Sequence, residues 1–251
     1  MSNALRGWRI WVSRAAHQAR GLCALIEDAG GEPLCLPALE IRPVSLDWSL
    51  VGDSDWLIFV SRNAVEQAFE QCPGLDRRAA RIAAIGRATR AALSQRNITV
   101  AEMPADGFDS ESLLRLAAFR DIAGQRVSIV KGRGGRALLA DTLRRRGARV
   151  ASIEVYRRAL PAYSAETLRR AFADRLDAMT ATSGEVLDNM SRLLGERRAL
   201  YDAPLIVVSQ RVADRAARLG FTRVEVSREP GDAALLQALI EQRGRNSTGK
   251  A

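Results

Sequence analysis

The sequence predicts an α/β fold built on two similar parallel sheets. Short apolar runs lead through a small polar turn into a segment with helical periodicity, at residues 10–12, 56–60, 81–85, 127–130, 178–181 and 205–208. Alternation of buried strands with helices is typical of βα units and parallel sheets. Gly30, Gly147 and Gly220 stand where the intervening helices should end.

The order of these units repeats along the chain. Residues 9–30 resemble 126–147, residues 56–65 resemble 178–187, and residues 82–100 resemble 205–224, each pair displaced by roughly 120 residues. A block of three βα units therefore occurs twice in the sequence, which predicts two similar α/β domains. Ligands of such sheets bind at the carboxyl ends of the strands.

Two extended segments, 37–44 and 153–161, interrupt the βα rhythm and carry prolines at their edges. Both follow the first unit of their repeat. They are either ordinary edge strands or the two connections between domains, and the pattern alone leaves both interpretations open.

Length and charge limit the number of domains and the kinds of binding partner that the chain can have. A chain of 251 residues forms one large or two modest domains. A net charge of +9 favours an anionic partner. The basic residues are dispersed along amphipathic helices, without a basic arm or a nucleic-acid-binding motif, so we expect no nucleic-acid partner. No apolar run approaches the roughly 18 residues of a membrane span, so no membrane partner is expected.

Cysteine and histidine usage gives further expectations. Cys23, Cys35 and Cys72 are an odd set without framework spacing, and we expect them to be small buried residues with reduced thiols in the cytoplasm. His17 is the single histidine, which argues against a histidine metal site and against a serine–histidine triad. We expect the polar tail, residues 243–251, to be disordered.

The turns between strands and helices are the predicted functional segments. They are rich in small and hydroxylic residues beside cations, and amides at a helix N-terminus bind anions. A single serine there is better interpreted as a helix cap, but six similar turns favour a shared anion-binding cleft. The candidate contacts are Ser13, Arg14, Ser61, Asn63, Gly86, Lys131, Arg133, Gly134, Gly135, Arg136, Thr182, Ser183 and Ser209.

The glycine-rich turn at 131–136 is the most specific of these. It follows the strand at 127–130 and should open a helix over 136–146. It lacks both the dinucleotide fingerprint and the GK[ST] ending of a phosphate loop. Lys131, Arg133 and Arg136 surround it, which favours a carboxylate over a nucleotide.

Tyr156 has two interpretations. It lies in an extended apolar stretch, next to Arg157 and Arg158, and such a tyrosine is commonly a half-buried strand aromatic. It can equally be a proton donor beside a ligand. The turns contain no close carboxylate pair that would carry acid/base chemistry instead.

These landmarks together resemble the uroporphyrinogen-III synthase family from about residue 8 to 240. They are VSR at 12–14, LPALEIRP at 36–43, DWLIFVSRNAV at 55–65, IAAIGRAT at 82–89, KGRGGRALLADTLRRRGARV at 131–150, EVYRR at 154–158, ATS at 181–183 and LIVVSQRVADRAARLGF at 205–221. The resemblance implies a discontinuous α/β domain at 1–36 and 163–251, an inserted α/β domain at 45–153, and a two-stranded linker at 37–44 and 154–162.

The resemblance also implies an activity. The family closes hydroxymethylbilane, a linear tetrapyrrole with eight carboxylates, into uroporphyrinogen III with loss of water and inversion of ring D. Orientation of the substrate is then the main catalytic task. No cofactor or metal is implied, Tyr156 is the candidate catalytic group, and we expect a monomer. The competing interpretation is a non-enzymatic module of two lobes that clamps a small anion.

Overall fold

The computed structural model describes residues 3–248, apart from the side chains of residue 50 and residues 246–248. Its contacts separate the chain into two compact units. Unit 1 comprises Met1–Glu40 and Ala159–Ala251, and unit 2 comprises Ile41–Arg158.

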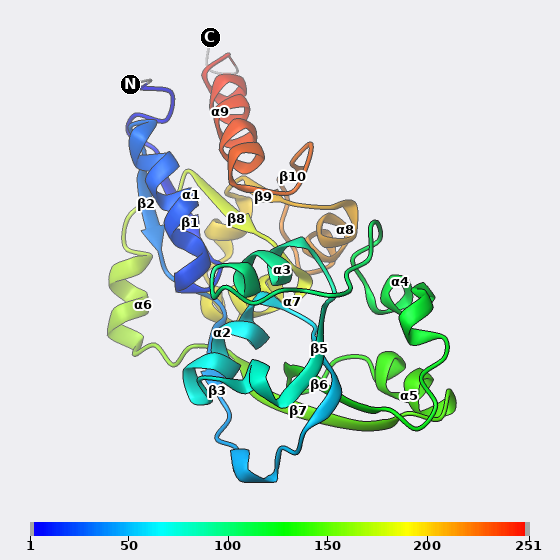
Figure 1. Cartoon of the computed structure of the whole chain (residues 1–251). Helices are drawn as coiled ribbons and strands as arrows, with labels where there is room; N and C mark the ends of the chain where they lie inside the picture. Colours follow the sequence, from blue (N-terminus) through cyan, green and yellow to red (C-terminus); the bar gives the residue numbers. More distant parts are fainter. Residues whose placement is uncertain (1–2, 249–251) are drawn as a thin grey trace. The chain divides into compact units, whose positions relative to one another are not determined.

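Unit 1 is built on a five-stranded sheet with the order β10-β9-β8-β1-β2, whose adjacent strands are parallel (Figure 1). The strands are β1 (Arg9–Val12), β2 (Glu32–Cys35), β8 (Ala178–Ala181), β9 (Leu205–Val207) and β10 (Val224–Val226). The helices are α1 (Ala16–Asp28), α6 (Ala165–Ala171), α7 (Gly184–Leu194), α8 (Gln210–Arg218) and α9 (Asp232–Thr248), with a 3-10 turn at Arg198–Asp202.

Unit 2 is built on a sheet with the order β3-β7-β6-β4-β5. The strands are β3 (Glu40–Pro43), β4 (Ser54–Phe59), β5 (Ala79–Ala84), β6 (Arg126–Gly132) and β7 (Arg149–Ala159). The helices are α2 (Arg62–Gln71), α3 (Arg87–Ser94), α4 (Ser110–Arg115) and α5 (Leu138–Arg145), with 3-10 turns at Trp48–Leu50, Leu75–Arg78 and Ala117–Phe119.

The predicted α/β fold with parallel sheets is confirmed, and the two sheets share a strand order. The series β9-β8-β1-β2 of unit 1 corresponds to β5-β4-β6-β7 of unit 2. Each sheet therefore combines strands from both copies of the sequence repeat. In the first copy β1 belongs to one sheet while β4 and β5 belong to the other.

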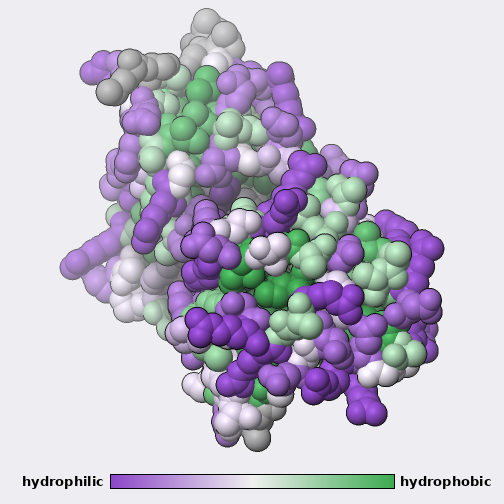
Figure 2. All heavy atoms as spheres, in the orientation of Figure 1, coloured by the Kyte–Doolittle hydropathy of each residue, from purple (hydrophilic) through white to green (hydrophobic). Residues whose placement is uncertain are grey.

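Amphipathic helices cover both faces of each sheet with their apolar sides, which explains why the strands are continuously apolar. In β1, Ile10 and Val12 pack against α1 and α9, whereas Trp11 faces the opposite layer of α7 and α8. In β4, Leu57 and Phe59 pack against α2 and α3, while its alternate residues meet α4 and α5. The surface in Figure 2 is mostly hydrophilic, and apolar residues reach it in separate patches.

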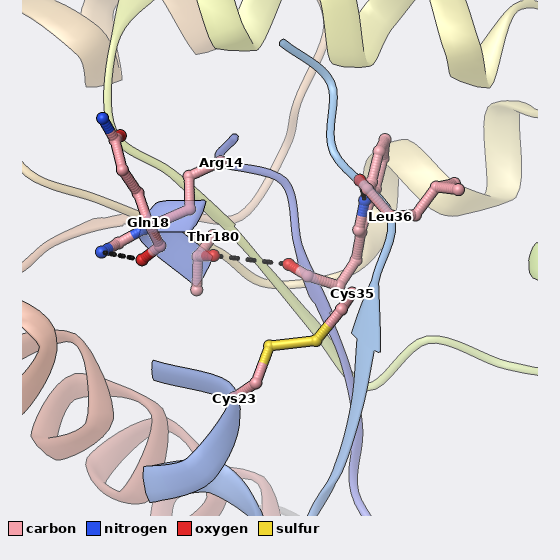
Figure 3. The surroundings of a disulfide bond; sticks show 7 residues. Arg14, Gln18, Cys23, Cys35, Leu36 and Thr180 are labelled. Atoms are coloured by element: carbon pink, nitrogen blue, oxygen red, sulfur yellow. Dashed lines mark hydrogen bonds between the residues drawn. A yellow bond between two sulfur atoms is a disulfide. The ribbon is translucent and has the colours of Figure 1, made fainter. Parts of the chain in front are cut away.

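The structure corrects the expectation of three reduced thiols. Cys23 and Cys35 form a disulfide, and only Cys72 is a free cysteine (Figure 3). Cys23 lies on the buried face of α1 and Cys35 ends β2, and this helix and strand pack together. Cys35 is also exposed rather than buried. The spacing of 12 residues could not indicate this pairing, because it depends on how α1 folds back onto β2.

Three smaller findings concern the helices. The expectation of a disordered tail is wrong in part, because α9 continues to Thr248, while residues 249–251 lie outside the described part of the chain. Helix α5 begins at Leu138, so Arg136 belongs to the preceding turn rather than to the helix. None of the described helices combines the length and apolarity required to cross a membrane.

Candidate active site

A pocket of about 370 Å³ lies in unit 2, at the carboxyl ends of its central strands. Val60 and Ser61 follow β4, Ile85 follows β5, and Lys131 and Gly132 end β6. This is where parallel α/β sheets bind ligands. Six of the predicted site residues line it, namely Ser61, Lys131, Gly134, Gly135, Arg136 and Tyr156.

Tyr156 contributes a nearly buried ring to this pocket, with 1% of its surface exposed. Its Oη lies 3.2 Å from Ser61 Oγ. It is thus more deeply buried than a half-covered strand aromatic, and its hydroxyl has a defined partner. A buried tyrosine hydroxyl that meets a second hydroxyl beside a pocket has the geometry of a positioned proton donor.

Gly132 makes room for this ring. A Cβ atom at position 132 would lie 2.5 Å from Tyr156 Cζ and 2.9 Å from Tyr156 Oη. The pairing of β6 with β7 shifts here, so that Lys131 pairs with Glu154 and Gly132 with Tyr156. Any larger residue at 132 would displace the phenol.

Ser61 has both of the roles considered for such serines. Its Oγ caps α2 by accepting the Ala64 amide at 3.1 Å, and it also borders the pocket. Because Oγ accepts from the amide, its own proton is available to Tyr156 Oη or to a ligand. In the chain of hydrogen bonds from the amide through Ser61 to Tyr156, each bond polarises the next.

The glycine-rich turn brings exposed backbone and cations to the pocket. Gly134 and Gly135 adopt left-handed backbone conformations, with φ of 80° and 82°. Arg136 is exposed and pairs with Glu111 at 2.5 Å. In the described part of the chain, no carboxylate forms an ion pair with the Lys131 ammonium, which is therefore the better placed cation for a ligand carboxylate.

Sequence reasoning missed the segment opposite this turn, Phe108, Asp109 and Ser110, which also lines the pocket. Asp109 caps α4 by accepting the Ser112 amide at 2.7 Å. Hydrogen bonds from the Ser112 hydroxyl and amide hold the pKa of the Asp109 carboxyl below its usual value. The motif of Asp109 three residues before Ser112 could have indicated the cap, whereas nothing in the sequence marks Phe108.

Three further candidates of unit 2 lie outside the pocket lining. Arg133 is exposed and pairs with Glu154, with Nε 3.4 Å from Oε2. Asn63 is the second residue of α2. Gly86 caps α3 and touches the site indirectly, because a Cβ there would lie 3.2 Å from Phe108 Cβ.

The candidates of unit 1 occupy the equivalent turns, but several have partners within the protein. Ser13 is buried and donates to the Thr180 carbonyl at 2.6 Å. Arg14 pairs with Asp232 at 2.5 Å and its side chain is only 13% exposed. Ser183 caps α7 and half-buried Thr182 precedes it, while Ser209 is the N-cap residue of α8 and makes no side-chain cap bond.

The site offers little to a metal ion. Within residues 3–248, no group of three or more histidine, cysteine, aspartate or glutamate side chains is arranged to hold one. The pocket combines hydroxyls, exposed glycine backbone and cations, which suits an anionic organic ligand.

Comparison with known proteins gives the family. The family model "Uroporphyrinogen-III synthase HemD" matches residues 21–237. The chain belongs to the uroporphyrinogen-III synthase family. It is 33% identical over 243 residues to the uroporphyrinogen-III synthase of Escherichia coli strain K12, covering 92% of this chain and 99% of that relative. It is 35% identical to that of Salmonella typhimurium, covering 90% and 92%.

Solved structures of uroporphyrinogen-III synthases share the fold. The one from Helicobacter pylori has a TM-score of 0.64 at 15% identity and covers 94% of this chain and 99% of its own. A mutant enzyme from Thermus thermophilus has a TM-score of 0.59 at 18% identity, with 95% and 100% covered. Membership of the uroporphyrinogen-III synthase family makes this chain an enzyme of tetrapyrrole biosynthesis, a lyase.

Proposed function

We propose that this chain cyclises hydroxymethylbilane to uroporphyrinogen III and that the pocket of unit 2 takes part in the reaction. The observation that carries the assignment to this pocket is the Tyr156–Ser61 pair beside the glycine-rich turn and Lys131. The substrate is a flexible polyanion, so a site that grips carboxylates can orient it. Orientation alone can lower a barrier by several kcal/mol when the reacting atoms are held in place.

Carboxylate binding is assigned to two kinds of donor. The Lys131 ammonium supplies charge, and the Gly135 backbone amide supplies a directed hydrogen bond once the substrate has entered. The Gly134 amide would first exchange its long bond to Glu154 Oε1, at 3.4 Å, for the substrate. The Arg136 guanidinium is exposed and would exchange Glu111 for a substrate carboxylate at little cost, since exposed ion pairs contribute only about 0–1 kcal/mol.

Tyr156 is the proposed general acid. A phenolic O–H group can donate both a hydrogen bond and a proton to a leaving oxygen. Donation from Oη to the terminal hydroxyl of the substrate would let that group leave as water. The last ring then attacks the electrophilic end through its substituted carbon, and the resulting spiro intermediate reopens and closes with ring D inverted. Rearomatisation of the pyrrole after closure releases one proton, which returns to Tyr156 Oη.

The turns of unit 1 are a separate proposal. Thr182, Ser183 and Ser209 stand at the N-termini of α7 and α8, where amides favour anions. Ser13 and Arg14 were predicted as contacts too. The Ser13 hydroxyl and Arg14 Nη1 have protein partners, whereas the buried Arg14 Nε has no hydrogen-bond partner in the described part of the chain. Their role in binding stays a prediction that variants must test.

We further propose the domain organisation that the resemblance implies, with domains at 1–36 plus 163–251 and at 45–153. The two units divide between Glu40 and Ile41 and between Arg158 and Ala159, inside the proposed linkers at 37–44 and 154–162, which supports it. A monomer in the cytoplasm, without nucleic-acid or membrane partners, is proposed as well. Light scattering on purified protein measures the mass directly.

The decisive experiment for the function is turnover with isomer analysis. Purified protein is mixed with freshly made hydroxymethylbilane, and the products are oxidised and separated into type I and type III. We expect type III in excess over the uncatalysed type I. Binding of the substrate without any change in the isomer ratio would support a non-enzymatic anion-binding module instead.

A further inference from the structure

Phe108 is an exposed aromatic residue at the pocket. Its side chain is 38% exposed, and among the residues whose side chains the structure describes it is the one large apolar side chain classed as exposed. It belongs to none of the hydrophobic clusters of the described core. Packing of the unit therefore does not account for a phenylalanine at this position.

The backbone holds Phe108 in an unfavourable conformation. Its φ is +36°, in a region that side chains other than glycine rarely adopt, and such residues tend to occur at functional sites. The segment is anchored on both sides. A Cβ at Gly107 would lie 2.0 Å from Ser112 Oγ, and Asp109 is fixed by capping α4.

Arg87 lies against the ring. Its Cζ is 4.9 Å from the Phe108 ring centroid, and it is the first residue of α3, directly after Gly86. The absence of a side chain at Gly86 allows this approach, since a Cβ there would already be 3.2 Å from Phe108 Cβ. Within the described part of the chain the exposed Arg87 guanidinium has no hydrogen-bond or ion-pair partner.

A second pair of the same kind provides a contrast. Arg96 Cζ lies 5.6 Å from the Phe69 ring, but Phe69 is partly buried against the core and stacks on Phe59. That phenylalanine has a packing role and does not line the pocket. The Phe108–Arg87 pair has the opposite properties: it lacks core contacts, and Phe108 lines the pocket.

We propose that Phe108 and Arg87 form a recognition platform for one pyrrole ring of the substrate and its carboxylate side chain. The pyrrole packs against the exposed part of the Phe108 ring, and the Arg87 guanidinium pairs with the carboxylate. Aromatic contact and charge then select a ring that carries an acid, which neither group does alone. The inference rests on the proposed function and adds a subsite to it.

Kinetics of four variants of the full chain test the platform. Phe108→Leu keeps apolar area but loses the aromatic face and should raise KM for hydroxymethylbilane about threefold to tenfold. Phe108→Trp should retain wild-type KM within about twofold. Arg87→Gln should raise KM about tenfold, and the matched control Arg96→Gln should leave it unchanged. The kcat should stay near wild type throughout, because the platform binds but does not react.

Thermal melting separates recognition from structure. Phe108→Gly relieves the positive φ and should melt at the wild-type temperature or above it while KM rises. A lower melting temperature for Phe108→Gly, with an unchanged KM for Phe108→Leu and Arg87→Gln, would show that the pair is structural and would overturn the proposal.

Binding of uroporphyrin III, a stable tetrapyrrole with the same acidic side chains, distinguishes a failure of the platform from a failure of the proposed function. If the wild type makes type III product and the Phe108 and Arg87 variants match it in KM and in uroporphyrin affinity, the platform is wrong and the proposed function stands. If the wild type binds uroporphyrin without turnover and the variants lose that binding, the platform stands and the proposed function fails. A wild type that neither reacts nor binds overturns both.

Discussion

Units 1 and 2 share a strand order, but their equivalent turns use their polar groups differently. After β1 in unit 1, the Ser13 hydroxyl donates to the Thr180 carbonyl and Arg14 pairs with Asp232. After the equivalent β6 in unit 2, Lys131 lines the pocket without an ion pair to any described residue. Gly134 and Gly135 are exposed there, and only the Gly134 amide has a partner, Glu154 Oε1 at the long distance of 3.4 Å. The repeated fold thus determines where the turns lie, whereas local contacts determine which donors a ligand can reach.

The same contrast holds for the serines after β8 and β4. Ser183 in unit 1 and Ser61 in unit 2 both cap the following helix. Of these two serines, Ser61 alone also meets a tyrosine hydroxyl, because β7 is 11 residues long and carries Tyr156 near its carboxyl end. The equivalent strand of unit 1, β2, has four residues and ends at Cys35.

The largest effect is expected for Tyr156→Phe. If the phenol is the general acid, its loss should lower kcat by about 10²–10⁴-fold, the usual contribution of such catalysis. Unit 1 offers a matched control, because Tyr201 Oη lies 3.0 Å from Ser191 Oγ in the same kind of hydroxyl pair. Tyr201→Phe should keep kcat while costing about 1 kcal/mol of stability. Single-turnover kinetics and thermal melts of both variants measure this, and equal rates would remove Tyr156 from the mechanism.

Gly132→Ala should have the next largest effect. The added Cβ would overlap the Tyr156 ring, so the hydroxyl must move, and a misplacement of about 1 Å can cost on the order of 10²-fold in rate. Gly184→Ala in unit 1 is the control, because the nearest atom to its added Cβ is Arg215 Cδ at 3.1 Å, which needs to move by only a few tenths of an ångström. We expect a rate change below about twofold there, consistent with the small effects of most surface substitutions. A normal rate for Gly132→Ala would mean that the ring position is not critical.

A third expected difference is the disulfide, which only unit 1 contains. Thiol titration of the unfolded chain should detect one free thiol, that of Cys72, and three after reduction. Closing a loop of this length stabilises a fold by about 3 kcal/mol. Cys23→Ser should therefore lower the melting temperature clearly, whereas Cys72→Ser should not. Three reactive thiols before reduction would show that the bond does not form in solution.

Local patterns carried much of the prediction. The apolar runs that became strands, the serine cap at Ser61 and the glycine-rich turn at 131–136 each follow from residues close in sequence. Tyr156 stood out by its neighbours, but its partner Ser61 is 95 residues away. The pattern gave no sign of this distance or of the need for Gly132.

Other features depend on contacts that no local pattern shows. The residue type and position of Ser13 favoured an anion contact, but its hydroxyl donates to the carbonyl of Thr180, 167 residues further along the chain. Phe108 lies in an irregular loop, where hydrophobic periodicity predicts neither structure nor function, and its strained backbone is apparent only from its φ angle. Which donors are occupied is a tertiary property that no local pattern shows, and the role of the candidates outside the pocket stays a prediction.

The smallest effects are expected for one variant in each of the two equivalent turns, the turn after β1 and the turn after β6. Lys131→Gln should raise KM for hydroxymethylbilane about tenfold, since a charge-assisted contact to a partly exposed cation is worth little more than 1.5 kcal/mol. It should leave the melting temperature unchanged, because no described carboxylate pairs with Lys131. Arg14→Gln should do the reverse, lowering stability by about 1–3 kcal/mol because Asp232 loses its partner, with little change in KM. Steady-state kinetics and urea unfolding of the two variants form a crossed test. A raised KM for Arg14→Gln at normal stability would restore Arg14 as a substrate contact and would mean that the turns of both units bind carboxylates.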